Sequence, residues 1–188
     1  IKYIYLNHTK PIKSELLLFI PKNNFPICII YCHGNCGDLG YSLFECYQLV
    51  KNTNCLILCF EYPGYGNLNK IKICEKKFYT VVQNAYRYAK NVLNFPEKNI
   101  FLYGFSLGTG IALDIACKNK LFPCSGLILQ SPYLSIMRIV YNFRRTFFLD
   151  IFANCDKIKK LKIPTLFIHG TDDNVVPYIH GRILAKLL

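Results

Sequence analysis

The sequence predicts an α/β fold in which helices cover both faces of a mostly parallel central sheet. Short apolar runs alternate along the chain with longer segments of helical periodicity, which is the pattern of repeated strand–helix–strand units. Two of these runs, residues 26–32 and 55–61, are apolar nearly throughout, as strands are when both faces of their sheet are buried. The chain has 188 residues, 52% of them hydrophobic, and no linker divides it, so we expect residues 1–188 to form a single domain.

The first half of the chain supplies three expected strands and two helices. Residues 14–20 form an apolar run that ends at a proline, and residues 26–32 and 55–61 are the buried strands. Residues 40–50 lie between those two strands and are predicted to form the helix that connects them. Residues 75–92 place apolar side chains on one face of a long amphipathic helix.

The second half of the chain continues the alternation. A turn signal at residues 95–98, Phe-Pro-Glu-Lys, precedes an apolar run at 99–103 that we interpret as the next strand. The elements expected after it are a helix at 106–118, a strand at 126–130, a helical or mixed segment at 133–150, a strand at 164–169 and a final helix at 178–188. Parallel sheets bind ligands at the carboxyl ends of their strands. The polar and glycine-rich segments that follow the strands are therefore the candidates for a functional site.

A G-x-S-x-G motif at residues 104–108 connects one of these strands to the following helix. In this context the motif is typical of a nucleophile elbow, in which a serine occupies a strained turn and only glycine fits beside it. The strain holds the hydroxyl above the sheet, and the amino end of the helix favours negative charge that develops there. We therefore predict that Ser106 is a catalytic nucleophile.

A second glycine-containing segment, Cys-His-Gly-Asn-Cys-Gly-Asp at residues 32–38, follows the first buried strand. In hydrolases with such an elbow, this loop donates one backbone N–H to the oxyanion, and the residue after the nucleophile donates the other. This predicts an oxyanion hole made by the N–H groups of Asn35 and Leu107. We expect His33 and Gly34 to lie beside the substrate, with His33 ordering the loop rather than transferring protons. The alternative is a glycine turn that carries a structural histidine.

The loop Phe-Glu-Tyr-Pro-Gly-Tyr-Gly at residues 60–66 follows the second buried strand and reaches the same edge of the sheet. Its glycines and proline favour a tight turn, which we expect to line the wall of the pocket. Tyr62 and Tyr65 are candidates for contact with the substrate. Ordinary packing is the alternative for both tyrosines.

The segment Thr-Asp-Asp-Asn at residues 171–174 follows the strand predicted at 164–169. A carboxylate at this place can accept a hydrogen bond from a histidine and hold its tautomer. Asp172 and Asp173 are both candidates for this role. The alternative is a solvated acidic turn that caps the next helix.

The base that would activate Ser106 is harder to place. The chain contains four histidines, and the order serine, acid, histidine requires one that follows the acid. Only His180 does so, seven residues after Asp173. Because this histidine normally follows one further strand, we expect it beyond Leu188, with the C-terminal strand and the histidine loop missing; His180 is the alternative. The chain also lacks an initiator methionine, so we expect a domain truncated at both ends.

The net charge of +12 suggests an anionic partner. The lysines are scattered, however, and their abundance together with asparagine, isoleucine and tyrosine is what an AT-rich genome produces. We therefore expect no nucleic-acid partner. Weak peripheral contact with an anionic membrane remains a hypothesis.

The ten cysteines contain no C-x-x-C pair. Cys28 and Cys32 share one face of a predicted strand, and Cys55 and Cys59 share one face of another. We interpret the cysteines as small core residues of a protein in a reducing compartment. The expected location is the cytoplasm or the cytosolic face of a membrane, and no metal or organic cofactor is expected.

Taken together, these motifs resemble those of the α/β-hydrolase domain-containing protein 17 group. The matching segments are, in order, His-Gly-Asn at 33–35 with Asp-Leu-Gly at 38–40, Tyr-Pro-Gly-Tyr-Gly at 62–66, Tyr-Gly-Phe-Ser-Leu-Gly at 103–108, Ser-Pro at 131–132 and His-Gly-Thr-Asp-Asp at 169–173. The resemblance covers the chain from about residue 26 onward and implies the α/β-hydrolase fold. It also implies that the second acid, Asp173, is the triad member, with Asp172 in reserve. One departure is that the first ten residues lack the cysteines of the palmitoylated N-terminal segment of that group.

Members of that group are serine hydrolases that remove palmitoyl groups from membrane-associated proteins. The resemblance therefore implies an enzyme that cleaves an ester or thioester, with an acylated protein or a lipid ester as substrate. Only a small cap fits between residues 131 and 162, and its apolar and basic residues are expected to line an acyl groove or to touch a membrane; ordinary core packing is the alternative. A catalytically silent α/β-hydrolase that serves as a scaffold or binding module is the second hypothesis for function.

Overall fold

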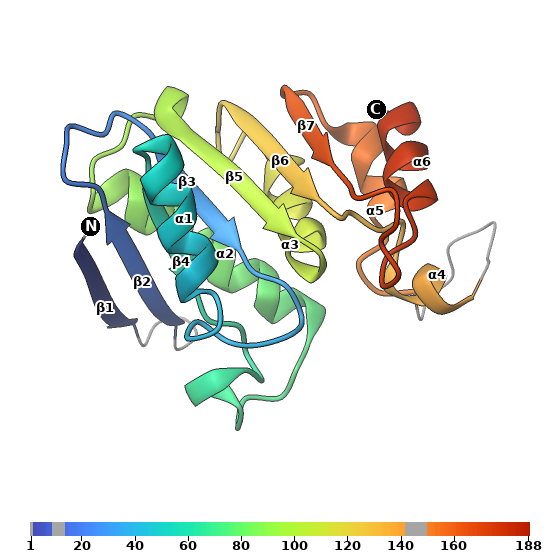
Figure 1. The fold of residues 1–188 in the computed structure, drawn as a ribbon, viewed down its shortest axis with the longest axis horizontal. Coiled ribbons are helices and arrows are strands. Elements are labelled where there is room, and N and C mark those ends of the chain that lie inside the picture. The colour runs from blue at the N-terminus through green and yellow to red at the C-terminus, as the bar shows by residue number, and fades with distance from the viewer. Residues whose placement is uncertain (1, 9–13, 142–149) are drawn as a thin grey trace.

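The computed structural model describes residues 2–8, 14–141 and 150–188, whose strands form one sheet (Figure 1). The sheet has seven strands in the order β1-β2-β4-β3-β5-β6-β7. The strands are β1 (Lys2–His8), β2 (Ser14–Ile20), β3 (Cys28–Cys32), β4 (Leu56–Phe60), β5 (Ile100–Phe105), β6 (Gly126–Gln130) and β7 (Thr165–Ile168). From β4 to β7 all pairs are parallel, whereas β1 and β2 add an antiparallel edge. The predicted α/β-hydrolase fold class is confirmed, and β1 is an edge strand that the sequence did not predict.

Helices cover the two faces of the sheet unequally. They are α1 (Leu43–Thr53), α2 (Glu75–Asn91), α3 (Leu107–Ala116), α4 (Ile136–Val140), α5 (Asn154–Lys157) and α6 (Ile179–Leu187), with short 3-10 turns η1 (Gly66–Leu68), η2 (Glu97–Asn99) and η3 (Ile158–Lys160). The helices α2 and α3 pack in the larger core, and α1 packs in a smaller core on the opposite face (Figure 1). Because side chains alternate along a strand, Ile30 of β3 points to the larger core and Ile29 to the smaller one.

In its described part, the segment between β6 and β7 contains only short helices. The predicted helical or mixed segment at 133–150 contains α4 only over Ile136–Val140 among the described residues. Residues 142–149, which carry most of the apolar and basic side chains of the proposed acyl groove, lie outside the described residues. A buried ion pair, with Nη1 of Arg138 2.7 Å from Oδ2 of Asp150, joins the two ends of this segment.

The ten cysteines are all free thiols. Cys28 and Cys32 share the larger core and Cys55 and Cys59 the smaller one, as the strand pattern predicted. Burial raises the pKa of the Cys117 thiol to about 11, which makes it an inert structural thiol. Cys36 and Cys74 are exposed, because they lie in loops at the carboxyl edge of the sheet. The prediction of core cysteines is therefore wrong for these two positions.

None of the helices in the described ranges combines the length and the apolar character that crossing a membrane requires.

Candidate active site

Ser106 occupies a strained turn between β5 and α3. Its backbone angles are φ 48° and ψ −115°, a combination that costs of order 1–3 kcal/mol in a non-glycine residue. The two motif glycines make the turn possible because a side chain at either place would collide with backbone. A Cβ at Gly104 would lie 2.6 Å from the carbonyl oxygen of Gly108, and one at Gly108 would lie 1.9 Å from that of Cys32. The turn therefore has the geometry that the G-x-S-x-G spacing predicted.

The loop after β3 lies directly against this turn. A Cβ built on Gly34 would be 3.7 Å from the Cβ of Ser106 and 3.0 Å from the ring of Phe105. Asn35 is the next residue, and Leu107 is the first residue of α3, where backbone N–H groups have no partner within the helix. The structure thus brings to Ser106 the two segments that carry the predicted donors. The assignment of the Asn35 and Leu107 N–H groups to an oxyanion hole remains a prediction.

Asp173 is held in the loop after β7. Its Oδ1 accepts hydrogen bonds from the N–H groups of Val175 at 3.0 Å and Val176 at 2.8 Å. Burial opposes ionisation, but the hydrogen bonds from Val176, the Ser131 hydroxyl and Val175, together with nearby His169, outweigh it and lower the pKa of the carboxyl group. The carboxylate is therefore ionised at neutral pH, as an acid that orients a histidine must be. Asp172, the reserve candidate, is exposed.

The spacing of the strands sets the distance between the nucleophile and the acid. The Ser106 N–H donates to the Gln130 carbonyl at 2.9 Å, and the Ser131 N–H donates to the Ile168 carbonyl at 2.8 Å, so β5, β6 and β7 end in step. Neighbouring strands lie about 4.8 Å apart, which puts the ends of β5 and β7 about 10 Å apart. Ser106 and the loop that carries Asp173 therefore lie at the same edge of the sheet, on either side of the end of β6.

The family to which the chain belongs follows from a match at residues 27–155 to the family model described as serine aminopeptidase, S33. The chain belongs to the serine aminopeptidase S33 family. It is 35% identical over 162 residues to the alpha/beta hydrolase domain-containing protein aho-3 of Caenorhabditis elegans, a match that covers 86% of this chain and 48% of that protein. It is 35% identical over 159 residues to the human alpha/beta hydrolase domain-containing protein 17C, which covers 84% of this chain and 47% of that protein. The resemblance to the protein 17 group is thus confirmed, and the chain spans about half the length of these relatives.

Solved structures support the fold of this S33-family domain. Est1E of Butyrivibrio proteoclasticus, solved with bound ferulic acid, superposes with a TM-score of 0.76 at 21% identity, covering 98% of this chain and 85% of that one. XC6422 of Xanthomonas campestris, described as an α/β serine hydrolase without a lid, gives a TM-score of 0.72 at 14% identity, covering 100% of this chain and 79% of that one. These superpositions show that the S33-family domain has the α/β-hydrolase fold.

The buried ring of His33 holds the loop of the S33-family domain that faces Ser106. It stacks on Tyr62 with ring centroids 3.9 Å apart, and the Tyr62 hydroxyl donates to the His33 carbonyl at 2.8 Å. The Nδ1 atom lies 2.9 Å from the Gly34 carbonyl oxygen. These contacts agree with a loop-ordering role for His33. Direct contact of its buried side chain with substrate, which the sequence also suggested, does not follow from this geometry.

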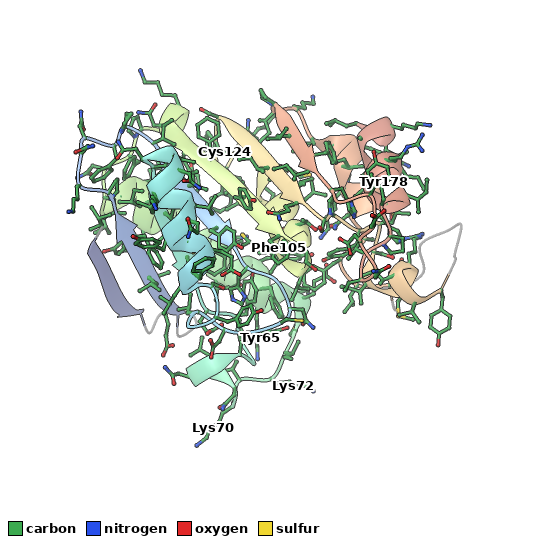
Figure 2. The ribbon with its side chains drawn as sticks, in the orientation of Figure 1. Tyr65, Lys70, Lys72, Phe105, Cys124 and Tyr178 are labelled. Atoms are coloured by element: carbon green, nitrogen blue, oxygen red, sulfur yellow. The ribbon has the colours of Figure 1, made fainter. Side chains whose placement is uncertain are left out.

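The two tyrosines of the loop after β4 differ in their surroundings. Tyr62 is fully buried, so the prediction that its side chain contacts substrate is corrected: it packs between His33 and Phe78. Tyr65 is half-buried, and its hydroxyl donates to Oδ1 of Asn35 (Figure 2). Tyr65 therefore stays a candidate for substrate contact at the rim of the S33-family site.

His180 is engaged elsewhere in the S33-family domain. It is buried, and its Nδ1 accepts a hydrogen bond from the Leu134 N–H at 3.2 Å. Burial, followed by the nearby His169 and Arg138, lowers the pKa of the ring, so it is neutral at pH 7. Among the described residues, His180 thus anchors the start of the cap, and this geometry disfavours it as the base.

His169, which directly follows β7, closes the loop that carries Asp173. Its Nε2 lies 2.8 Å from the Val176 carbonyl oxygen and 3.5 Å from Oδ2 of Asp173. No pattern in the sequence marks Ser131 and His169 as partners of Asp173. The only available signal was that both residues directly follow neighbouring strands.

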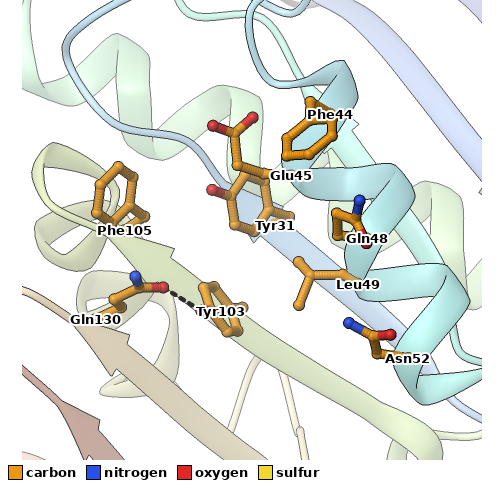
Figure 3. A pocket seen from close by; sticks show the side chains of 9 residues that line it. All are labelled: Tyr31, Phe44, Glu45, Gln48, Leu49, Asn52, Tyr103, Phe105 and Gln130. Carbon is orange, nitrogen blue, oxygen red and sulfur yellow. Dashed lines mark hydrogen bonds between the residues drawn. The ribbon is translucent and has the colours of Figure 1, made fainter.

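A pocket of about 400 Å³ opens between α1 and the sheet of the S33-family domain (Figure 3). Its lining residues are Tyr31, Phe44, Glu45, Gln48, Leu49, Asn52, Tyr103, Phe105 and Gln130. Phe105 precedes the nucleophile, and Gln130 accepts the Ser106 N–H through its carbonyl, so the inner end of the pocket lies behind the elbow. Its volume is in the range of small-molecule sites, roughly 300–1,000 Å³.

Proposed function

We propose that this domain cleaves an ester or thioester of an acyl chain carried by a protein or a lipid. The observation that carries the proposal is the strained Ser106 turn, packed between Gly104 and Gly108 and flanked by the Gly34 loop. Strain of this kind persists where the surrounding structure requires it, and it clusters at active sites. The similarity to the protein 17 group favours an acyl-thioester substrate, as in palmitoyl-protein thioesterases.

The proposed reaction has two steps. The Ser106 Oγ attacks the carbonyl carbon while a histidine takes the hydroxyl proton, and the Asn35 and Leu107 N–H groups hold the oxyanion. The bond to the leaving thiol or alcohol then breaks, and the histidine returns the proton to that leaving group. In the second step water attacks the acyl carbon while the histidine takes its proton. The bond from the acyl carbon to the Ser106 Oγ then breaks, the histidine returns the proton to Ser106, and the carboxylic acid leaves. Asp173 orients the histidine throughout, and no metal or organic cofactor takes part.

We propose that the histidine comes from sequence that follows Leu188, because the described contacts of His180 and His169 are structural. The match to longer relatives is consistent with this. The supporting geometry is that Ser106 and Asp173 follow β5 and β7, which end at the same edge of the sheet. Without the histidine, the oxyanion hole and binding alone give only residual catalysis.

The proposed substrate and location remain those that the resemblance implies. In the described part of the segment between β6 and β7, the helices are short, α4 with five residues and α5 with four, which favours a lightly covered site that a protein-linked acyl chain can reach. We propose peripheral contact with an anionic membrane from the cytosolic side, supported by the net charge of +12.

A fluorophosphonate probe tests the proposal. We would treat this chain, a version extended at its C-terminus by the natural sequence, and Ser106→Ala of each, and map the labelled peptide. Labelling at Ser106 only in the extended version supports a serine hydrolase whose histidine follows Leu188. Labelling of the short chain would favour His180 as the base.

A silent α/β-hydrolase scaffold is the second candidate, favoured by the structural contacts of both histidines near the site. Absence of labelling in both versions, with both folded, would select it.

A further inference from the structure

We infer that Glu61 is a positioning residue that fixes the conformation of the loop at residues 33–39. This inference rests on the proposed function in so far as that loop supplies an oxyanion donor. Glu61 is the first residue after β4 and is 2% exposed. A carboxylate is seldom buried to this degree unless other groups satisfy it. Its partners therefore show what it does.

Both ends of the 33–39 loop meet the Glu61 carboxylate. At the far end, Oε2 accepts the Leu39 N–H at 3.0 Å. At the near end, Oε1 lies 3.4 Å from Nε2 of His33, a close approach without a hydrogen bond. Oε1 also accepts the N–H of Tyr62 at 3.0 Å, which fixes the carboxylate on its own loop. Glu61 thus binds the far stem of the loop that carries Asn35 directly, and it holds the near stem through Tyr62, whose hydroxyl donates to the His33 carbonyl.

The residues after Glu61 hold the same loop from the same side. The Tyr62 hydroxyl donates to the His33 carbonyl at 2.8 Å, and the Tyr65 hydroxyl donates to the Asn35 side chain. The backbone of Gly66 closes over the carboxylate, because a Cβ there would lie 2.4 Å from Oε2 of Glu61. The loop after β4 therefore clamps the loop after β3, and Glu61 lies at the centre of the clamp.

The chemistry of the clamp requires a carboxylate. An ionised carboxylate is an acceptor at both oxygens, so it satisfies the Leu39 and Tyr62 N–H groups together. A glutamine of the same shape has one acceptor oxygen and one amide nitrogen that only donates, so one of the two N–H groups would lose its partner. An oxyanion hole works by holding its donors in place before the reaction. A small displacement caused by a change outside the reacting atoms can lower the rate about a hundredfold.

The test compares Glu61→Gln with Glu15→Gln. Glu15 of β2 is a suitable control because it is also buried, at 3% exposure, and lines the same cavity of about 610 Å³ as Glu61. Its carboxylate accepts a hydrogen bond from the Asn67 side chain at 3.3 Å. Each variant is measured in two ways. The first is hydrogen–deuterium exchange of peptides that cover residues 33–40. The second is steady-state kinetics and the rate of fluorophosphonate labelling, measured on whichever version of the chain, short or C-terminally extended, is labelled at Ser106.

We expect Glu61→Gln to speed exchange in residues 33–40 at least tenfold and to leave the β5 and β6 peptides unchanged. We also expect kcat and the labelling rate to fall about tenfold or more, with KM within about twofold, because the oxyanion exists only in the transition state. Glu15→Gln should change neither the exchange of the loop nor kcat. A comparable loss of kcat in both variants would overturn the inference, because the effect would then be one of general stability.

The exchange measurement separates this inference from the proposed function. Exchange needs no turnover, so unchanged exchange in folded Glu61→Gln overturns the positioning role whether or not the wild type is active. If the wild type is never labelled but Glu61→Gln speeds exchange in the loop, the proposed hydrolase function is refuted. The positioning role of Glu61 is then still supported. Should Glu61→Gln fail to fold, Glu61→Asp gives the same local expectation, because it keeps the charge but is too short to reach both stems.

Discussion

Gly108 packs directly on Cys32, because a Cβ at position 108 would lie 1.9 Å from the Cys32 carbonyl oxygen. The contact joins the first turn of α3 to the end of β3, and so fixes the helix that starts after Ser106 against the loop that starts after Cys32. Both predicted oxyanion donors lie within a few residues of this contact. The contact between Gly108 and the Cys32 carbonyl therefore positions the start of α3 relative to the loop after β3, the two segments that carry the predicted oxyanion donors.

Replacing Gly108 by alanine should be strongly destabilising. The methyl group would overlap strand backbone that cannot move aside, so we expect a loss of about 3 kcal/mol or more in the free energy of unfolding. This exceeds the roughly 1 kcal/mol that alanine gains over glycine in a helix. The control is Gly170→Ala, where nothing lies within 4 Å of the added Cβ. Urea denaturation of both variants checks the prediction, and equal stabilities would contradict it.

The strain at Ser106 should be measurable in the same assay. Glycine adopts a positive φ without the steric cost that any other residue has at φ 48°. We therefore expect Ser106→Gly to exceed Ser106→Ala by about 1 kcal/mol in the free energy of unfolding, after the greater freedom of glycine in the unfolded chain is subtracted. Neither variant should react with a fluorophosphonate. If alanine proves more stable than glycine, the strain at Ser106 costs less than the freedom that glycine gains in the unfolded chain, which contradicts the prediction.

The parts that sequence alone predicted are those in which the physical reason is local. Gly104, Ser106 and Gly108 lie within five residues, so their turn could be predicted from their order. The apolar runs of β3 and β4 likewise revealed buried parallel strands. The pairing of β1 with β2 was missed because nothing in Lys2–His8 shows which strand it pairs with, and that register is seen only in the structure.

Contacts between loops could not be predicted in this way. The Glu61 carboxylate reaches the N–H of Leu39 from 22 residues away, and no pattern around either residue marks the pair. The same holds for the hydroxyl of Ser131 at Asp173. Such partners become visible only when the register of the sheet has aligned the ends of the strands. The sequence therefore indicated which loops lie at the same edge of the sheet, and the structure shows the hydrogen bonds that hold those loops together.

The neutral His180 ring should make stability depend on pH. Its pKa is lowered in the folded state, mainly by burial and then by His169 and Arg138. A group whose folded pKa is depressed gives its full stabilisation above its unfolded value, about 6.5, and loses it as pH falls towards the folded value. We expect the free energy of unfolding to fall below pH 6.5 by up to about 1.4 kcal/mol per pH unit from this single proton.

The matched variant is His180→Gln, whose side-chain oxygen can still accept the Leu134 N–H. It should flatten the decline between pH 6.5 and 5, while the depressed pKa of Asp173 leaves a separate loss at lower pH. A histidine whose pKa is raised by a neighbouring acid would have the opposite effect, because it would increase the free energy of unfolding as pH falls. Urea midpoints of wild type and variant between pH 8 and 4 check the prediction, and parallel curves would show that His180 does not cause the decline.

The last prediction concerns the proposed membrane contact. Lys70 and Lys72 are exposed on the loop that leaves η1 and extend from the body of the molecule, next to Ile73, which is 58% exposed (Figure 2). This loop follows β4 and so lies at the edge of the sheet where Ser106 lies. A lysine near an anionic bilayer contributes about 1 kcal/mol, and an exposed apolar side chain adds to the partitioning.

Reversing both charges with Lys70→Glu and Lys72→Glu should weaken binding to vesicles that contain phosphatidylserine at least tenfold at low salt. The control is Lys98→Glu with Lys120→Glu, the same change in net charge on two exposed lysines at the opposite edge, where β5 and β6 begin. Sedimentation with anionic and with neutral vesicles measures both pairs. If the two pairs weaken binding equally, the attraction is one of net charge and no face of the molecule is preferred. If only the first pair weakens it, the edge that carries Ser106 faces the bilayer, where an acyl chain held at the membrane can reach the nucleophile.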